Sequence, residues 1–180
     1  AKEIKKYEEA KKVLEMGLDL VADSKQLKVQ FYLYLGDIFH IFKENKKSDE
    51  YFDKLLEIDG NNILVLNNYS YYLSLREEFL EKAEQMSRQT IEAEPNNATY
   101  LDTYAWILFK MANFEKALEI IEKAILNSGD KSAVIIEHYG DILYKNGQKD
   151  KAKQQWKNAV ETGKGSELLQ KKMEEGIFIE

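Results

Sequence analysis

Small residues recur along this chain every 34 or 35 positions, and this repeat constrains the fold more than any other feature. One series steps by 34, 35 and 35 residues through Gly36, Ser70, Ala105 and Gly140. A second series steps by 35, 34 and 35 through Ser48, Ala83, Ala117 and Ala152. Two interleaved series with one period predict a chain built from repeated units of two elements each.

The unit between residues 97 and 130 shows both elements most clearly. Its first half follows the i, i+3, i+4, i+7 spacing of a single helical face, at Leu101, Tyr104, Ala105 and Leu108. Residues 111–113 break this pattern, and a second helical pattern begins at Phe114. Each unit is therefore predicted to be a helix–turn–helix. The small side chains of Ala105 and Ala117 would let its two helices approach to the short end of the usual separation, about 8–10 Å.

The repeat predicts one continuous array over residues 1–180. Its full repeats are expected at 27–62, 63–97, 98–131 and 132–162, with a lone second helix of a truncated repeat at 1–22 and a capping helix at 166–175. The missing first helix before residue 1 indicates a fragment or a processed form of a longer protein.

The chain after the last repeat is expected to close the array. Gly163 and Gly165 break the helix, and Ser166 is a favourable N-cap for a short helix with a polar outer face. The apolar residues 177–179 either pack onto the last repeat or form a small association patch.

The motifs within these units resemble the tetratricopeptide repeat. The resemblance covers roughly residues 1–162 and rests on Tyr32, Leu35, Gly36 and Phe39, on Ile136, Tyr139, Gly140 and Leu143, and on Ala152, Trp156 and Pro95. Residues 100–108 and 137–143 look like the last two repeats of bacterial tetratricopeptide proteins, many of which are extracytoplasmic lipoproteins. The resemblance implies an all-α fold, a right-handed α-α superhelix. It also implies that partners bind along the inner, concave groove formed by the first helices.

Charge and composition limit the classes of partner. The formal net charge is −6, which disfavours nucleic acid because phosphate binding needs a basic face. No cysteine is present, so thiolate metal sites and disulfides are excluded. No apolar run approaches about 18 residues, so this segment is not expected to insert into a membrane.

First-helix residues outside the packing set are the candidates for partner binding. They predict an acidic and aromatic groove, formed by Asp37, Asn67, Tyr71, Asp102, Trp106, Phe109, Glu137, Asp141 and Tyr144. Aromatic anchors among polar groups are typical of interface hot spots, and the carboxylates favour a partner bearing Lys or Arg. Two alternatives remain: the aromatics could pack against neighbouring repeats, and the carboxylates could simply be solvated. A clamp for a C-terminal carboxylate is disfavoured, because only Asn67 has the required character.

Enzymatic readings find little support in the sequence. His40 and His138 lie in different repeats without a metal-ligand partner nearby in sequence, and no glycine-rich phosphate loop or nucleophile motif occurs. We therefore expect no catalytic residue, cofactor or metal. The chain is predicted to be a scaffold that binds a peptide or protein segment. The alternative is a structural spacer or assembly module of a larger complex. The bacterial resemblance favours an extracytoplasmic location over a cytoplasmic one.

Overall fold

A computed structural model describes residues 2–179, and helices joined by short turns dominate these residues. The α-helices are α1 (Lys2–Gly17), α2 (Lys25–Ile41), α3 (Asn45–Ile58), α4 (Ile63–Arg76), α5 (Leu80–Ala93), α6 (Ala98–Lys110), α7 (Phe114–Leu126), α8 (Ala133–Lys145), α9 (Lys149–Thr162) and α10 (Leu169–Glu175). A short 3-10 helix, η1 (Gly129–Lys131), precedes α8. The all-helical, paired architecture expected from the repeat is confirmed.

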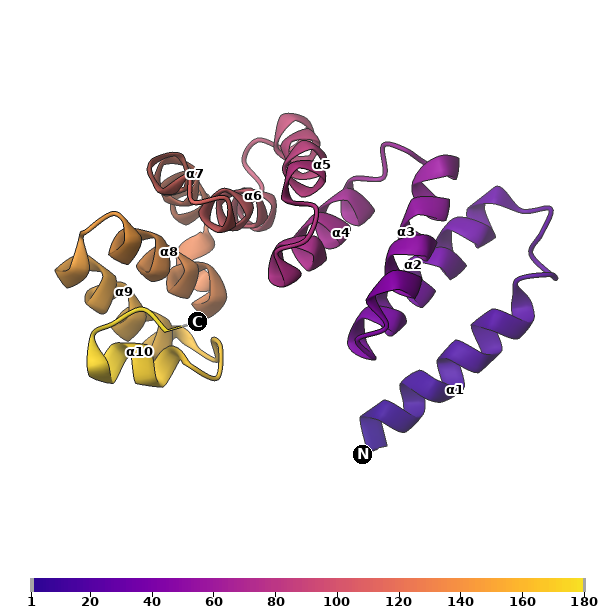
Figure 1. Ribbon diagram of the computed structural model, residues 1–180, viewed down its shortest axis with the longest axis horizontal. Coiled ribbons are helices and arrows are strands. Elements are labelled where there is room, and N and C mark those ends of the chain that lie inside the picture. The colour runs from indigo at the N-terminus through magenta and orange to yellow at the C-terminus, as the bar shows by residue number, and fades with distance from the viewer. Residues whose placement is uncertain (1, 180) are drawn as a thin grey trace. The chain divides into compact units, whose positions relative to one another are not determined.

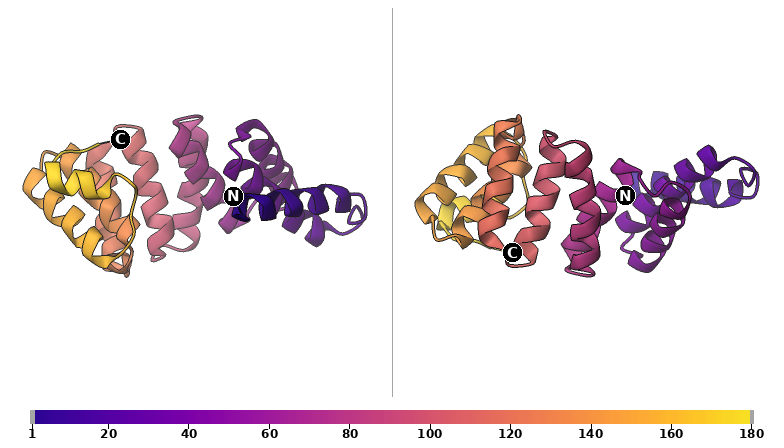
Figure 2. Two further views of the ribbon diagram at one scale, coloured as in Figure 1. Left: turned by 90° about the horizontal axis from the view of Figure 1, so that it is seen from below. Right: turned by 90° about the horizontal axis from the view of Figure 1, so that it is seen from above.

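The chain forms two compact units, residues 1–69 and residues 70–180, and the boundary falls within α4. Unit 1 contains α1 to α3 and the start of α4, and unit 2 contains the end of α4 and α5 to α10. Figure 1 shows the helices of each unit following one another as pairs joined by tight turns. In unit 2, α10 packs against α9, and both views of Figure 2 show the two helices as neighbours.

Within each pair a small residue permits the helices to cross closely. In unit 1, a Cβ on Gly36 would lie 2.7 Å from Cε1 of Phe52, too close for an ordinary contact. In unit 2, a Cβ on Gly140 would lie 2.5 Å from Cδ1 of Trp156. Gly36 and Gly140, two of the residues that set the repeat, therefore allow a large aromatic ring to pack directly on the helix backbone. Ser48 adds a buried hydrogen bond of 2.8 Å from its Oγ to the carbonyl oxygen of Gly36.

The cores follow from this packing. The core of unit 1 includes Leu35, Phe39, Phe52, Leu55 and Tyr69, each no more than 2% exposed. The core of unit 2 has one cluster between α6, α7 and α8 and another between α8, α9 and α10. The cluster around α9 is centred on Trp156, which is fully buried.

The structure departs from the sequence expectation at both ends of the described chain. α1 ends at Gly17 and turns fill residues 18–23, whereas helical spacing had suggested a helix to residue 22. Gly17 is the reason, since a Cβ there would lie 2.8 Å from Cε2 of Phe31 and glycine is a poor helix former. α10 begins at Leu169 instead of at Ser166, and Ser166 belongs to the turn before it, where its Oγ accepts a hydrogen bond of 3.2 Å from Leu168 N–H.

Candidate functional site

Two N-caps fix where the first helices of the last two repeats begin. The side chain of Asn97 accepts hydrogen bonds from the backbone N–H groups of Thr99 and Tyr100, at 3.0 and 3.3 Å. Ser132 Oγ accepts one from Ile135 N–H at 3.4 Å. Such caps satisfy backbone donors that the first turn of a helix leaves unpaired. With these starting points α6 and α8 bring six side chains together, and we call them the first-helix face: Asp102, Trp106, Phe109, Glu137, His138 and Asp141.

The two carboxylates of α8 share one cation. The Lys172 ammonium lies 3.0 Å from Oε1 of Glu137 and 2.7 Å from Oδ2 of Asp141. All three residues are buried, with exposures of 5%, 3% and 1% for Lys172, Glu137 and Asp141. Ser166 adds a backbone N–H donated to Oε2 of Glu137 at 2.7 Å and a hydroxyl donated to Oε1. Two carboxylates at this spacing therefore form a well-defined site for an ammonium group.

Burial and pairing shift the pKa values of the α8 carboxylates in opposite directions. Burial raises the pKa of Asp141 to about 6, although the Lys172 ammonium opposes this. Burial would also raise the pKa of Glu137, but the hydrogen bonds from Ser166 and Lys172 outweigh it and hold this pKa below its ordinary value. Asp141 also accepts a hydrogen bond of 2.9 Å from the indole N–H of Trp156. The carboxylate that receives the ammonium is thus held in place by the core of its own repeat.

Aromatic rings cover the α6 side of the first-helix face. The Trp106 ring stacks on His138 with ring centroids 4.1 Å apart, and on Phe109 at 4.8 Å. His138 Nδ1 pairs with Oδ1 of Asp102 at 2.9 Å. Burial would lower the pKa of His138, but the Asp102 carboxylate outweighs it and the pKa is raised. The face therefore joins an aromatic surface on α6 to an acidic site on α8.

The chain's own C-terminal segment, residues 166–179, lies on this face. Its Lys172 provides the ammonium described above. Its Phe178 packs edge-on against Phe109, with ring centroids 5.6 Å apart. Lys145 lies over the Phe178 ring at 4.5 Å. Of the two readings of the apolar tail, the structure has the packed one, and the tail reaches α6 as well as the last repeat.

Next to this segment a pocket of about 330 Å³ remains open. Tyr71, Leu75, Trp106 and Val134 form much of its apolar lining, and Phe178 and Ile179 lie at its edge. Leu75 and Val134 are 46% and 40% exposed, so they mark its rim. The indole N–H of Trp106 is buried and has no hydrogen-bond acceptor. Glu137, Asp141 and Lys172 also line the pocket, so its lining is mainly apolar and partly charged.

The structure brings together five of the nine residues predicted to bind a partner. Asp102, Trp106, Phe109, Glu137 and Asp141 form the first-helix face and are buried to different extents.

The other four predicted residues lie outside this face. Tyr71 lines the adjoining pocket, where burial raises its pKa to about 12. Tyr144 lies instead against Trp156, with ring centroids 5.8 Å apart. Asp37 and Asn67 belong to unit 1. A binding role for the nine residues remains a prediction.

Sequence reasoning missed one residue of the face, His138, and the three residues of the C-terminal segment that contact it, Lys172, Ser166 and Phe178. One signal was present for Lys172. Helical spacing aligns it with Leu169 and Met173, on the side of α10 that faces inward. A lysine on an inward face needs a carboxylate partner, because a buried unpaired charge is very costly. For His138 nothing in its sequence neighbourhood indicated Asp102, which lies 36 positions earlier.

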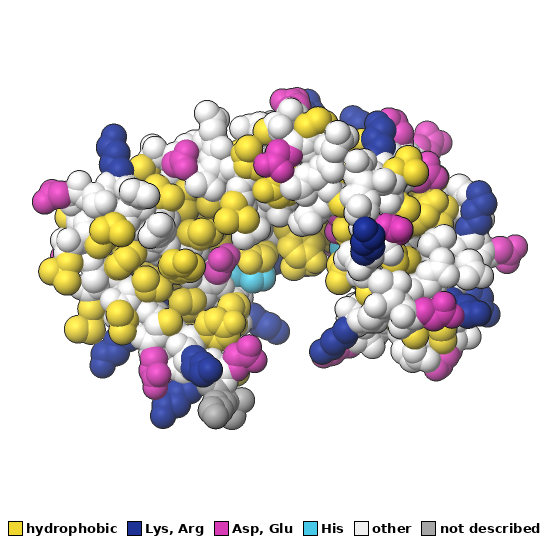
Figure 3. All heavy atoms as spheres, turned by 180° about the vertical axis from the view of Figure 1, so that it is seen from behind, with side chains coloured by type: hydrophobic (Ala, Val, Ile, Leu, Met, Phe, Trp, Pro, Cys, Tyr) yellow, Lys and Arg dark blue, Asp and Glu magenta, His cyan; other side chains and the backbone are white. Residues whose placement is uncertain are grey.

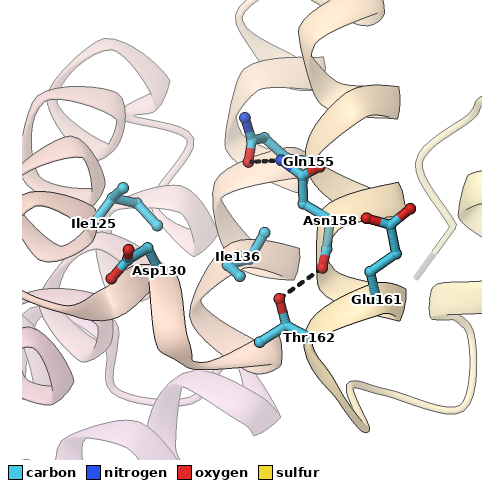
Figure 4. Close-up of a pocket in the computed structure, with 7 residues that line it drawn as sticks. All are labelled: Ile125, Asp130, Ile136, Gln155, Asn158, Glu161 and Thr162. Carbon is cyan, nitrogen blue, oxygen red and sulfur yellow. Dashed lines mark hydrogen bonds between the residues drawn. The ribbon is translucent and has the colours of Figure 1, made fainter.

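A second pocket, of about 340 Å³, lies where α7, η1, α8 and α9 meet (Figure 4). Its polar groups largely satisfy one another. The side-chain amide of Asn158 donates to Oε1 of Gln155 at 3.2 Å, and the backbone carbonyl oxygen of Asn158 accepts from the Thr162 hydroxyl at 2.7 Å. Asp130 and Glu161 also line it. Nothing in this arrangement indicates a particular ligand.

Comparison with known proteins identifies the repeat. Residues 29–62 and 98–130 match the family model of the tetratricopeptide repeat, so these two segments are tetratricopeptide repeats. No curated protein sequence matches it significantly.

Solved structures with the same fold include PilF of Pseudomonas aeruginosa. That match has a TM-score of 0.73 and 23% identity, and it covers 89% of this chain and 71% of PilF. PilW, a widely conserved type IV pilus biogenesis factor, matches with a TM-score of 0.75 and 18% identity over 88% of this chain and 72% of its own. MamA of Desulfovibrio magneticus matches with a TM-score of 0.72 and 17% identity over 87% and 85%. At these identities the likeness establishes the fold.

Two further findings concern the described residues alone. Among residues 2–179, no helix is both long and apolar enough to cross a bilayer. The same residues contain no group of three or more His, Cys, Asp or Glu side chains placed to hold a metal ion.

Proposed function

We propose that this chain is a binding scaffold whose first-helix face holds a partner segment carrying a Lys or Arg together with an aromatic or large aliphatic residue. Tetratricopeptide repeats are in general non-enzymatic scaffolds for protein–protein interaction, which gives the broad class. The finer assignment, to one face and one kind of segment, is the proposal.

The ammonium site on α8 is the observation that carries this proposal. Glu137 and Asp141 are spaced one helical turn apart and converge on a single nitrogen. Charge-assisted hydrogen bonds of this kind are about twice as strong as neutral ones, and they discriminate sharply against an acidic group. A lysine of a partner that displaces Lys172 would meet the same two acceptors.

The aromatic side of the face and its open pocket supply the second half of the recognition. Trp106 and Phe109 present stacked rings, and an unfilled apolar space adjoins Trp106. A buried aromatic or aliphatic anchor in such a pocket provides most of the affinity in typical interfaces.

Binding of defined peptides tests this proposal directly. We suggest a panel of labelled twelve-residue peptides that combine Lys or Glu with Phe, Leu or Ser, followed by fluorescence anisotropy. Peptides with both Lys and Phe are expected to bind most tightly, and those with Glu in place of Lys should fail to bind. Val134→Lys places a cation on the rim of the pocket and should weaken binding at least tenfold, since like charges repel.

Leu126→Lys is the matched control for this variant. Leu126 lies at the end of α7 and is 84% exposed, outside the first-helix face. The same change of charge there should leave peptide affinity unaltered. A preference for acidic peptides, or equal losses in the two variants, would refute the assignment to this face.

One observation favours a second function, assembly into a larger complex. α1 and the turn after it expose Val13, Met16 and Leu20 at 69%, 70% and 89%. Exposed apolar residues grouped in this way often mark an interface. Figure 3 shows that hydrophobic side chains gather on the visible side of unit 1, at the left of the view. Association that is abolished by Met16→Lys in analytical ultracentrifugation would support an assembly role, whereas a monomer at all concentrations would argue against self-assembly.

The bacterial resemblance also supports a proposal about where the chain is located. We place the chain outside the cytoplasm of a bacterium, on the resemblance of its last repeats to extracytoplasmic tetratricopeptide proteins. Cell fractionation with an antibody against this chain tests that location.

A further inference from the structure

The C-terminal segment, residues 166–179, satisfies both halves of the recognition described above. Its Lys172 fills the ammonium site, and its Phe178 covers Phe109 on the aromatic side. A cation and an aromatic ring are the two features expected of a partner. In chemical terms the segment is a ligand that the chain carries itself.

Besides these contacts, the segment contributes two hydrogen bonds from Ser166 to Glu137 and one buried apolar side chain, Leu169. In α10, Leu169 and Lys172 are the buried residues, while Met173 and Phe178 are only partly covered. The core beneath is formed mainly by Ile136, Leu143, Ala152, Trp156 and Ala159 from α8 and α9. Elements with few buried apolar contacts open at a lower free energy than the core does. The segment can therefore leave while α8 and α9 stay packed.

Gly165 controls how closely the segment approaches the face. A Cβ at this position would lie 2.5 Å from Oε2 of Glu137 and 2.7 Å from Cδ2 of Leu169. Glu137 cannot move away without breaking its hydrogen bonds to Ser166 and Lys172. Glycine is thus required for docking of the segment, although it takes no part in the face itself.

The segment leaves part of the site unused. The pocket of about 330 Å³ next to Phe178 stays open, and the Trp106 indole N–H stays without an acceptor. A partner segment that places a further apolar side chain in this pocket would bury surface that the C-terminal segment does not. Such a partner gains binding free energy over the internal ligand in proportion to that surface.

We propose that residues 166–179 act as an internal competing ligand, which occupies the first-helix face until a partner segment with a cation, an aromatic ring and an additional apolar anchor displaces it. This inference rests on the proposed function. The observed affinity for a partner is then its intrinsic affinity multiplied by the fraction of molecules in which the segment has undocked. A tethered segment competes as if present at about millimolar concentration.

A peptide with the sequence of residues 166–179, labelled at its N-terminus, tests the inference on the full-length chain. The Gly165→Ala variant should bind this peptide at least about tenfold more tightly than the wild type, because its own segment docks poorly while its face is unchanged. Gly163→Ala is the matched control, since a Cβ there meets only Cβ of Ala133 at 3.9 Å. It should bind the peptide as the wild type does.

Hydrogen exchange on the same proteins separates this role from simple capping. In Gly165→Ala the amides of residues 166–179 should exchange faster, while those of α6 to α9 keep their protection. Loss of protection throughout α8 and α9 would show that the segment is a structural cap, and would overturn the inference.

The outcomes for the inference and for the proposed function are distinct. If peptides with Lys and Phe bind but the peptide of residues 166–179 neither binds nor competes with them, the internal ligand is refuted and the proposed function stands. If the peptide of residues 166–179 binds to Gly165→Ala but no peptide of the panel does, the face serves only its own segment. Both proposals would then fail.

Discussion

The repeat formed by α2 and α3 and the repeat formed by α8 and α9 share a packing scheme but differ in what lies on the first helix. Gly36 packs under Phe52 in one, and Gly140 packs under Trp156 in the other. The residue after each glycine is an aspartate, Asp37 or Asp141. Asp37 is partly exposed in unit 1, whereas Asp141 is 1% exposed and bound by Lys172.

This difference teaches that the repeat determines the helix crossing but not the state of the face. The crossing depends on two positions within one repeat, a small residue and a large ring. The state of the face depends on a segment that the repeat does not include. The repeat of α8 and α9 also differs in a hydrogen bond, which the indole N–H of Trp156 donates to Asp141. Phe52 holds the equivalent position in the repeat of α2 and α3, and its side chain has no donor.

The largest effect is expected from removing the cation of the last repeat. Lys172→Ala should lower the free energy of unfolding by about 3 kcal/mol, because it leaves two buried carboxylates unpaired. This is the low end of the usual range, since the C-terminal segment can undock and expose them to water. Urea denaturation of the purified variant measures the change.

Lys171→Ala is the control for that variant. Lys171 lies 3.8 Å from Glu175 on the exposed side of α10, and surface ion pairs contribute little. Its stability should match that of the wild type. Equal stability of the Lys172 variant would mean that the ion pairs with Glu137 and Asp141 do not hold the segment.

The shared crossing can be tested by the same substitution in both repeats. Gly36→Ala and Gly140→Ala should each cost about 1–3 kcal/mol, because the new methyl group overlaps an aromatic ring. The gain in helix propensity from alanine offsets part of this loss. Thermal unfolding followed by circular dichroism provides the comparison. A loss of stability in only one of the two variants would contradict a shared packing scheme in these repeats.

A smaller effect is expected from pH, and it should belong to unit 2. The pKa of Asp141 in the folded chain, about 6, lies above its ordinary value of 3.8. The folded state therefore takes up this proton more readily than the unfolded state. The associated stability is fully present below the ordinary pKa and is lost as the pH rises through about 6.

Between pH 7.5 and pH 5 the free energy of unfolding should therefore increase by about 1 kcal/mol. The raised pKa of His138 acts in the same direction, and the lowered pKa of Glu137 opposes it only at more acidic pH. Asp141→Asn should remove most of the increase. Urea titrations of both proteins at the two pH values measure it, and an unchanged slope in the variant would contradict the assignment to Asp141.

The smallest effect is expected at the uncovered end of the chain. Met16→Ala on α1 should change the free energy of unfolding by no more than about 0.5 kcal/mol, because Met16 is 70% exposed. Leu169→Ala, a comparable truncation in α10, should cost about 2 kcal/mol, since Leu169 is 4% exposed. Equal losses in the two variants would show that α1 is covered in solution.

Much of the helical architecture was predictable because it depends on local spacing. The turns at residues 111–113 and 145–147 lie where the apolar pattern is interrupted, and α6 and α8 end there. Ser24 caps α2 by accepting a hydrogen bond of 3.3 Å from Leu27 N–H, and serine just before a helical pattern is typical of a helix start. At the end of α1 the pattern of apolar residues alone predicted a helix that was too long, because that pattern takes no account of Gly17.

The candidate site was predictable only in part, for a physical reason. Helical spacing placed Asp102, Trp106, Phe109, Glu137 and Asp141 on the faces of two first helices. It could not show whether these faces meet water or protein, since burial depends on segments distant in sequence. Lys172 and Glu137 are more than thirty positions apart in the sequence, and so are His138 and Asp102.

The sequence by itself determined that this chain is built from helix–turn–helix repeats, because the small residues that allow two helices to cross recur with the period of one repeat. It also determined the acidic and aromatic character of the first helices. Only the tertiary structure decided that the C-terminal segment covers the last two of these helices with a lysine and a phenylalanine. Ion pairs and ring contacts depend on distances in space. The spacing of residues along the chain does not specify these distances for residues that are far apart in sequence.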